Sequence, residues 1–274
     1  MTRANPDCKT FVSLSIAHPS ICHSVLQGFD KLTVLRGSVR LLRPCTSFYQ
    51  SYSPVTDKPH HQTVERIGID ESGKGDYFGP LVIAAVFVDA TTQGELTLMN
   101  VRDSKKLSDG RILDMAPDIR TICPYSIIAI GPQRYNELYA KIRNLNRLLA
   151  WGHAKALETL LDRVSCGRAI ADQFGDERLI LNALQEKGRT IVLEQRHKAE
   201  SDLAVAAASI LARAEFLLRL KRLSEEIGTT LPKGASPAVE LAGRMIVKKH
   251  GEERLGSVAK LHFKTTQSVL GKID

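Results

Sequence analysis

From residue 64 onward, hydrophobic positions fall into short β-branched runs separated by longer stretches with helical spacing. The second run, PLVIAAVFVD, is apolar on both alternating faces, which predicts a strand inside a sheet. A glycine-rich segment joins it to the first run, so we expect these two strands to form a hairpin. The pattern indicates an α/β or mixed α+β core. Strands are predicted at residues 64–70, 80–89, 122–130, 167–172 and 189–194.

Helices are predicted in the gaps at residues 146–163, 177–187 and 202–227. The second is followed by Gly188, a typical helix stop. The third begins with alanine-rich sequence, which allows its backbone to approach another element closely. At the N-terminus of this third helix, Asp202 is interpreted as the N-cap. For Glu200, helix capping and metal binding are equally supported by the local sequence.

Residues 1–63 differ from the rest, because they are serine-rich and their apolar pieces are short. Residues 51–62 contain two prolines and several polar residues, which is typical of a linker. We therefore predict an N-terminal accessory segment and linker over residues 1–63 and one main domain over residues 64–274.

Composition and charge narrow the class of protein. The net charge of +8 comes from the two ends: residues 1–63 hold seven basic and three acidic side chains, and residues 232–274 hold eight and four. Such basic ends suit a polyanion, although a solubilising surface is the alternative. The chain lacks the run of about 18 apolar residues that spans a bilayer, so we expect no membrane and a cytoplasmic location. Its five scattered cysteines indicate neither a disulfide framework nor a zinc site.

The sequence GIDESGKG (residues 68–75) places Asp70 and Glu71 at the end of a predicted strand, before a flexible basic loop. These groups suit a divalent cation and a phosphate. The string is also close to a nucleotide-binding loop, but Gly75 stands where a Ser or Thr would bind magnesium, and the two acids would repel a triphosphate. We therefore interpret the carboxylates as the reactive groups.

Asp172 ends the fourth predicted strand, where a turn-forming aspartate is the competing interpretation. Asp103 is interpreted as a helix cap outside the site. If Asp70, Glu71, Asp172 and Glu200 meet, their repulsion raises pKa values unless cations neutralise it. Oxygen ligands favour Mg²⁺ or Mn²⁺, and such a cluster can support phosphodiester cleavage by water. This is a hydrolytic nuclease hypothesis.

Six ordered motifs make the chain resemble a known family, the type 2 ribonucleases H, and within it bacterial ribonuclease HIII. The resemblance covers roughly residues 64–266. Lys74 and Glu200 favour ribonuclease HIII over ribonuclease HII, because the HII members of the family usually have Arg and Asp, respectively, at these two positions. The motifs are DESGKGDYFGP (70–80), DSKKL (103–107), ADQF (171–174), KAES (198–201), AAASI (206–210) and AKLHF (259–263).

The resemblance implies a ribonuclease H-like fold, a mixed β-sheet flanked by helices, with residues 64–274 as the catalytic domain. It implies endonucleolytic cleavage of the RNA strand in RNA/DNA hybrids, leaving 5′-phosphate and 3′-hydroxyl ends, with Mg²⁺ or Mn²⁺ as cofactor. No obligate protein partner is evident. The family's acidic quartet, the metal ligands and catalytic residues, falls on Asp70, Glu71, Asp172 and Glu200.

Substrate-binding roles follow from the same resemblance. The loop is expected to approach the sugar-phosphate backbone near the 2′-hydroxyl, and lysines are expected to neutralise phosphate. For every lysine, a solvated surface is the competing interpretation. The loop comprises Ser72, Gly73, Lys74 and Gly75; the lysines are Lys74 and Lys198, then with less support Lys105, Lys106, Lys248, Lys249 and Lys264.

The N-terminus departs from the family pattern, since ribonuclease HIII carries a small module there that resembles the TATA-binding protein. Residues 1–63 are short for it, and a reduced substrate-binding module is the alternative to a simple accessory segment. Two other classes compete with the nuclease: an ATPase built on the incomplete nucleotide-binding loop, and a nucleic-acid-binding module without activity. The second would be expected to lose carboxylates that only metal binding requires.

Overall fold

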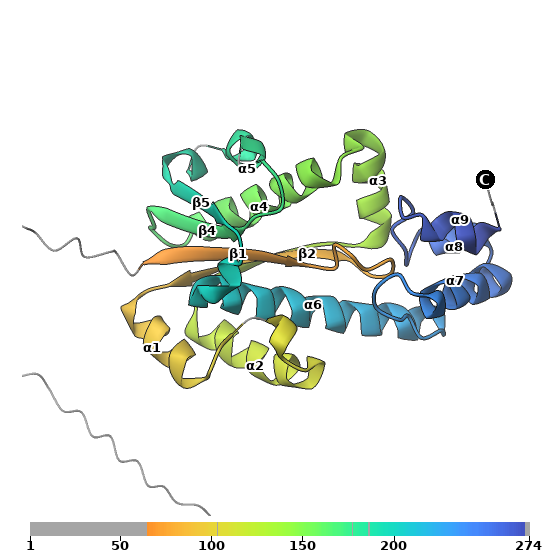
Figure 1. Cartoon of the computed structure of the whole chain (residues 1–274), viewed down its shortest axis with the longest axis horizontal. Helices are drawn as coiled ribbons and strands as arrows, with labels where there is room; N and C mark the ends of the chain where they lie inside the picture. The colour runs from red at the N-terminus through yellow and green to blue at the C-terminus, as the bar shows by residue number, and fades with distance from the viewer. Residues whose placement is uncertain (1–64, 103, 177, 186, 272–274) are drawn as a thin grey trace, which may run out of the picture. The chain divides into compact units, whose positions relative to one another are not determined.

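A five-stranded mixed sheet forms the centre of the computed structural model, which describes residues 65–102, 104–176, 178–185 and 187–271 (Figure 1). The strand order is β3-β2-β1-β4-β5. β1, β2 and β3 pair antiparallel, whereas β4 and β5 run parallel to β1. This confirms the predicted hairpin and sheet. The strands are β1 (Arg66–Ser72), β2 (Leu81–Val88), β3 (Tyr125–Ile130), β4 (Arg168–Asp172) and β5 (Val192–Arg196).

Helices cover both faces of the sheet (Figure 1). One face packs against α3 (Pro132–Ile142), α4 (Leu145–Leu161) and α5 (Arg178–Ala183). The other packs against α1 (Ala90–Leu98), α2 (Asp109–Ile122) and the long α6 (Leu203–Ile227). The C-terminal helices are α7 (Pro237–His250), α8 (Glu252–Leu255) and α9 (Thr265–Leu270), and the short 3₁₀ turns are η1 (Ser104–Lys106), η2 (Gly188–Thr190) and η3 (Ala199–Ser201).

All five predicted strands occur, but several predicted boundaries were wrong. The helix expected at 177–187 ends at Ala183, because the Glu158 carboxylate on α4 accepts hydrogen bonds from the backbone N–H groups of Gln185 and Gly188 at 2.7 and 2.9 Å. Gly188 therefore starts a 3₁₀ turn, and β5 begins at Val192 rather than at residue 189. The third strand begins at Tyr125, because α2 continues to residue 122.

The contact between β1 and α6 is unusually close. A Cβ atom added to Gly68 would lie 2.1 Å from the backbone carbon of Ala204. The alanines of α6 and the missing side chain at Gly68 thus bring the two backbones together, as the alanine-rich pattern predicted. Since Asp70 and Glu71 follow on the same strand, this contact fixes the strand that carries them.

Several predictions fall outside the described residues. They concern residues 1–63, Asp103 and the cysteines Cys8, Cys22 and Cys45. Of the other cysteines, Cys123 is buried and Cys166 is partly buried. None of the described helices has both the length and the apolar character needed to cross a membrane.

Candidate active site

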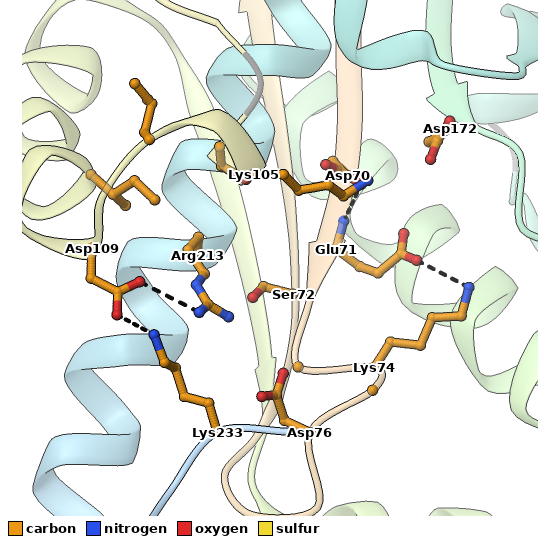
Figure 2. Close-up of a pocket in the computed structure, with 15 residues that line it drawn as sticks. Asp70, Glu71, Ser72, Lys74, Asp76, Lys105, Asp109, Asp172, Arg213 and Lys233 are labelled. Carbon is orange, nitrogen blue, oxygen red and sulfur yellow. Dashed lines mark hydrogen bonds and ion pairs between the residues drawn. The ribbon is translucent and has the colours of Figure 1, made fainter. Parts of the chain in front are cut away.

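Three predicted carboxylates line one cavity of about 650 Å³ (Figure 2). β1 and β4 are parallel neighbours, with Ile69 opposite Ala171, so both strands end at the same edge of the sheet. Asp70 and Glu71 lie at the end of β1, and Asp172 lies at the end of β4. The fold therefore brings together groups that are about a hundred residues apart in the chain.

The two neighbouring acids point to opposite faces of the sheet, because side chains alternate along a strand. Ile69 and Ala171 belong to the core on the α4 side. Asp70 and Asp172, each one residue further on, consequently face α6, and Glu71 faces α4.

Glu71 is held by two donors. Nε2 of His153, a completely buried residue on α4, lies 3.1 Å from Glu71 Oε2, and Lys74 Nζ lies 3.4 Å from Oε1. Burial raises the pKa of Glu71, but His153 and Lys74 outweigh it, so this pKa is lowered overall. The surroundings thus keep the carboxylate ionised.

For Asp70, the effects that raise the pKa outweigh those that lower it. Burial and then the charges of Glu71 and Asp172 raise its pKa well above the ordinary value, against the hydrogen bond from the Glu71 N–H (2.8 Å) and the charge of Lys105. A cation bound in this cavity would relieve the burial and repulsion that disfavour the charged form of Asp70.

Glu200 lies on η3 and does not line the cavity of the other three acids. It lines a neighbouring cavity of about 270 Å³, together with Lys198. Also on η3, the Ala199 N–H donates to Asp172 Oδ1 at 3.3 Å. Glu200 therefore follows directly after a residue bonded to the site, but its role as a ligand stays a prediction.

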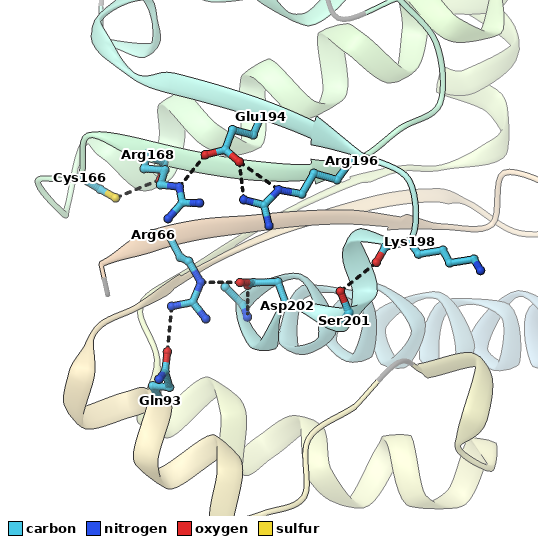
Figure 3. Close-up of polar contacts among 10 residues, drawn as sticks. Arg66, Gln93, Cys166, Arg168, Glu194, Arg196, Lys198, Ser201 and Asp202 are labelled. Carbon is cyan, nitrogen blue, oxygen red and sulfur yellow. Dashed lines mark hydrogen bonds and ion pairs between the residues drawn. The ribbon is translucent and has the colours of Figure 1, made fainter. Parts of the chain in front are cut away.

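Asp202 is the N-cap of α6, as predicted. Its Oδ1 accepts the Ala204 N–H at 2.8 Å, and Oδ2 lies 2.6 Å from Arg66 Nε (Figure 3). The structure thus gives Asp202 a structural role.

Lys198 is exposed, and its backbone lies in the left-handed region (φ 57°). Its side chain is directed away from Asp202 in Figure 3.

The donor set fits a hard divalent cation, although the acids do not form a closed cage. Within the described residues, no three His, Cys, Asp or Glu side chains are grouped so as to hold a metal ion. Mg²⁺ typically uses one or two carboxylates and keeps waters or substrate phosphates as its other ligands. Carboxylates that line one open cavity meet that requirement.

The predicted substrate loop, Ser72 to Gly75, has a fixed backbone. Gly73 has φ +87°, and a Cβ atom there would lie 2.2 Å from the Pro80 carbonyl oxygen, whereas Gly75 is exposed with open space around it. Lys74 lies beside Glu71, with its Nζ also 5.8 Å from the centre of the Phe174 ring. This segment joins antiparallel strands rather than a strand and a helix, so the nucleotide-binding loop interpretation does not fit.

The remaining predicted lysines lie on the surface. None of them lines the cavity of the three acids except Lys105. The exposed lysines are Lys105, Lys106, Lys248, Lys249 and Lys264.

Sequence reasoning assigned no role to four groups near the site. His153 was a lone histidine in an apolar helix, which gives no signal. Lys260 is completely buried, and its ammonium donates to the carbonyls of Asp76 and Gly79 at 2.6 and 2.7 Å. Arg213 and Lys233 line the same cavity as the acids. Their positions follow from the tertiary structure alone.

Known proteins are similar to this chain over most of its length. The family described as Ribonuclease HII matches residues 67–266. A ribonuclease HIII from Protochlamydia amoebophila is 52% identical over 207 residues, which is 76% of this chain and 69% of that protein. The crystal structure of Bst-RNase HIII in complex with Mn²⁺ has a TM-score of 0.72 at 35% identity and covers 76% of this chain and 70% of its own. Aquifex aeolicus RNase H3 has a TM-score of 0.62 at 30% identity, covering 74% of each chain.

Proposed function

The chain belongs to the ribonuclease HII family and is similar to ribonuclease HIII proteins, and from this premise we propose that it hydrolyses the RNA strand of RNA/DNA hybrids. The reaction is endonucleolytic and leaves 5′-phosphate and 3′-hydroxyl ends. The observation that carries the proposal is the cavity lined by Asp70, Glu71 and Asp172 at the ends of two parallel strands.

Mg²⁺ or Mn²⁺ is the proposed cofactor, held by Asp70, Glu71, Asp172 and Glu200. When bound, such ions supply an activated water and stabilise charge on the leaving oxygen. The protein's own contribution is orientation. Glu71 is held by the hydrogen bond with His153, and Asp172 is held by the Ala199 N–H.

The loop from Ser72 to Gly75 is the proposed contact with the RNA strand. It lines the cavity together with the carboxylates. Gly73 and Gly75 allow a sugar-phosphate backbone to come close, which would let backbone groups contact the 2′-hydroxyl that distinguishes RNA from DNA. Lys74 and Lys198 are the proposed phosphate partners.

A cleavage assay tests the proposal. The wild type is incubated with an end-labelled RNA/DNA hybrid, with and without Mg²⁺, beside Asp70→Asn, Asp172→Asn and the control Asp114→Asn, an exposed acid on α2. We expect Mg²⁺-dependent cleavage by the wild type and the control, and loss of at least about a hundredfold in the two site variants. Binding without cleavage would favour an inactive binding module, and ATP hydrolysis in place of cleavage would favour an ATPase.

We propose separately that residues 1–63 are an accessory segment outside the catalytic domain. Deleting residues 1–60 tests it. We expect cleavage to persist, with hybrid affinity changed little. A large loss of affinity by a still folded protein would show that the segment binds substrate.

A further inference from the structure

Trp151, the only tryptophan of the chain, is also the one exposed aromatic residue in the part of the chain that the structure describes. It lies on α4 and is 42% exposed. Tryptophan in globular proteins is on average highly buried. Trp151 lines neither of the two cavities at the proposed active site, so the cleavage chemistry gives the ring no role.

The packing of α4 directs Trp151 outward. A Cβ atom added to Gly152 would lie 2.7 Å from Ile83 Cδ1 on β2, so the helix is close against the sheet at this point. His153 is completely buried and contacts Glu71. Because successive residues on an α-helix are about 100° apart, Trp151 and His153 point in nearly opposite directions. The indole thus lies on the outer side of α4, which covers the face of the sheet opposite α6 (Figure 1).

Basic side chains flank the indole. Arg147 and Lys155 are four residues before and after Trp151, so the three side chains are neighbours along one side of the helix. The two cations are about 12 Å apart along the helix axis, with the indole between them. Residues 141–155 contain four basic side chains, all of them exposed, and no acidic one.

The acids that follow on α4 already have partners. The Glu158 carboxylate accepts two backbone N–H groups from the segment before β5, and Asp162 pairs with Lys187 at 2.6 Å. Within the described residues, no carboxylate forms an ion pair with Arg147 or Lys155. Both cations beside Trp151 can therefore bind an anionic ligand.

We propose that Arg147, Trp151 and Lys155 form a binding site for single-stranded nucleic acid, with an unpaired base stacked on the indole and phosphates beside the two cations. The site lies outside the cavity of the acids and goes beyond the proposed function. Aromatic rings together with basic side chains bind single-stranded nucleic acid with little sequence preference. A duplex covers the faces of its bases, and an acidic peptide has no use for an exposed ring.

The beginning of α4 adjoins the segment that follows Asp172. A Cβ atom added to Gly175 would lie 3.2 Å from Asn146 Nδ2, near the N-terminus of the helix. The site is therefore next to an element of the proposed active site. Nucleic acid is the polyanion expected there, and this one step of the argument rests on the proposed function.

The fluorescence of Trp151 tests the inference directly, because no other tryptophan contributes to the signal. Oligodeoxythymidine, oligouridine, a blunt RNA/DNA hybrid and polyglutamate are titrated separately into the full chain without divalent cations. We expect both oligonucleotides to quench the fluorescence to saturation, and the hybrid and polyglutamate to leave it nearly unchanged. Quenching by only one oligonucleotide supports the site and identifies the sugar that it prefers.

Two results overturn the inference. One is no quenching by either oligonucleotide. The other is equal quenching by the hybrid, which would indicate a duplex contact, or by polyglutamate, which would indicate a surface for acidic polypeptides.

Substitutions locate the site through the affinity for labelled oligodeoxythymidine over a salt series. We expect Trp151→Leu to weaken binding about tenfold, the effect of losing one stacked base, and Trp151→Phe to keep most of the affinity. Arg147→Gln and Lys155→Gln are each expected to lower the slope of log affinity against log salt by about 0.7. The matched control is Arg222→Gln, an exposed arginine on α6 that should leave the slope unchanged. Equal effects of Arg222→Gln and Arg147→Gln would refute a localised site.

Hybrid cleavage with Mg²⁺ separates this inference from the proposed function. A wild type that cleaves the hybrid, but whose fluorescence no oligonucleotide quenches, refutes this site alone. A wild type that is quenched by oligonucleotides, but never cleaves the hybrid, refutes the proposed function and leaves the site intact.

Discussion

Nε2 of His153 lies 3.1 Å from Oε2 of Glu71, and this contact comes from the opposite side of the sheet to α6. Nδ1 of the ring is buried without a hydrogen-bond partner among the described residues. A ring with its proton on Nε2 satisfies this environment best, because it donates to the carboxylate and leaves no buried N–H unpaired. This tautomer is assigned from the hydrogen-bond network.

The contact makes His153 a positioning residue for Glu71. In His153→Leu, Glu71 loses a donor that both orients it and lowers its pKa. We expect cleavage to fall about 10- to 100-fold and to need more Mg²⁺ for half of the maximal rate. The measurement is the rate of hybrid cleavage across a Mg²⁺ titration.

His153→Gln is the matched variant, because its amide can still donate to Glu71. It is expected to recover part of the rate. Wild-type rate and Mg²⁺ dependence in a folded His153→Leu protein would contradict the positioning role.

Glu200 and Asp202 are two residues apart, but substitutions at the two positions are expected to change different properties, cleavage in one case and stability in the other. Glu200→Gln should reduce cleavage strongly and leave stability nearly unchanged, because Glu200 is a proposed metal ligand. Asp202→Ala removes the cap of α6 and leaves the nearly buried Arg66 without this partner, which we expect to cost about 2–4 kcal/mol of unfolding free energy. Denaturant unfolding and cleavage assays on both variants check this. Reversed results would exchange the two assignments.

The approach of β1 to α6 predicts the effect of a single methyl group. Gly68→Ala places a Cβ 2.1 Å from the Ala204 backbone, so the strand or the helix has to move. We expect a loss of roughly 3 kcal/mol in unfolding free energy and reduced cleavage, since the same strand carries Asp70 and Glu71.

Gly94→Ala is the control for this change. Gly94 lies within α1 with no atom near the added Cβ, so alanine there should stabilise the protein by about 0.5–1 kcal/mol. Denaturant midpoints of the two variants give the comparison. Equal midpoints would show that the close approach carries no strain.

Lys260 predicts a pH dependence of stability. Burial lowers its pKa to about 7 in the folded protein, although the nearby charge of Asp76 acts to raise it. Between pH 7 and the ordinary lysine pKa of about 10.5, the unfolded chain then binds more protons than the folded one. Stability should therefore rise with pH in this window, by at most about 1.4 kcal/mol per pH unit from this residue, and fall again as pH decreases towards 7.

The comparison is with Lys260→Met, which removes this titrating group. The contributions of all other groups then cancel in the difference between the two proteins. Unfolding free energies are measured at several pH values from 7.5 to 10. The wild type should show the steeper increase. Parallel curves would show instead that the carbonyls of Asp76 and Gly79 keep the ammonium charged.

The sequence predicted most of the sheet, because each strand carries its own local signal. β2 is apolar on both faces, and it lies inside the sheet with a helix layer on each side. The predicted helix at 177–187 was too long, because the signal that ends it comes from Glu158, some 25 residues earlier in the chain. A window of local sequence does not contain that hydrogen bond.

What the sequence by itself determined is a set of candidate carboxylates: Asp70, Glu71 and Asp172 could be selected because they stand at the ends of predicted strands, which are visible in local patterns. Tertiary structure alone decided which face of the sheet each acid occupies, that His153 contacts Glu71, and that Arg213 and Lys233 complete the cavity. The physical reason is that these contacts depend on the register of β1 with β4 and on the packing of α4 and α6. Both arise from pairing between segments far apart in the chain, which no local pattern encodes.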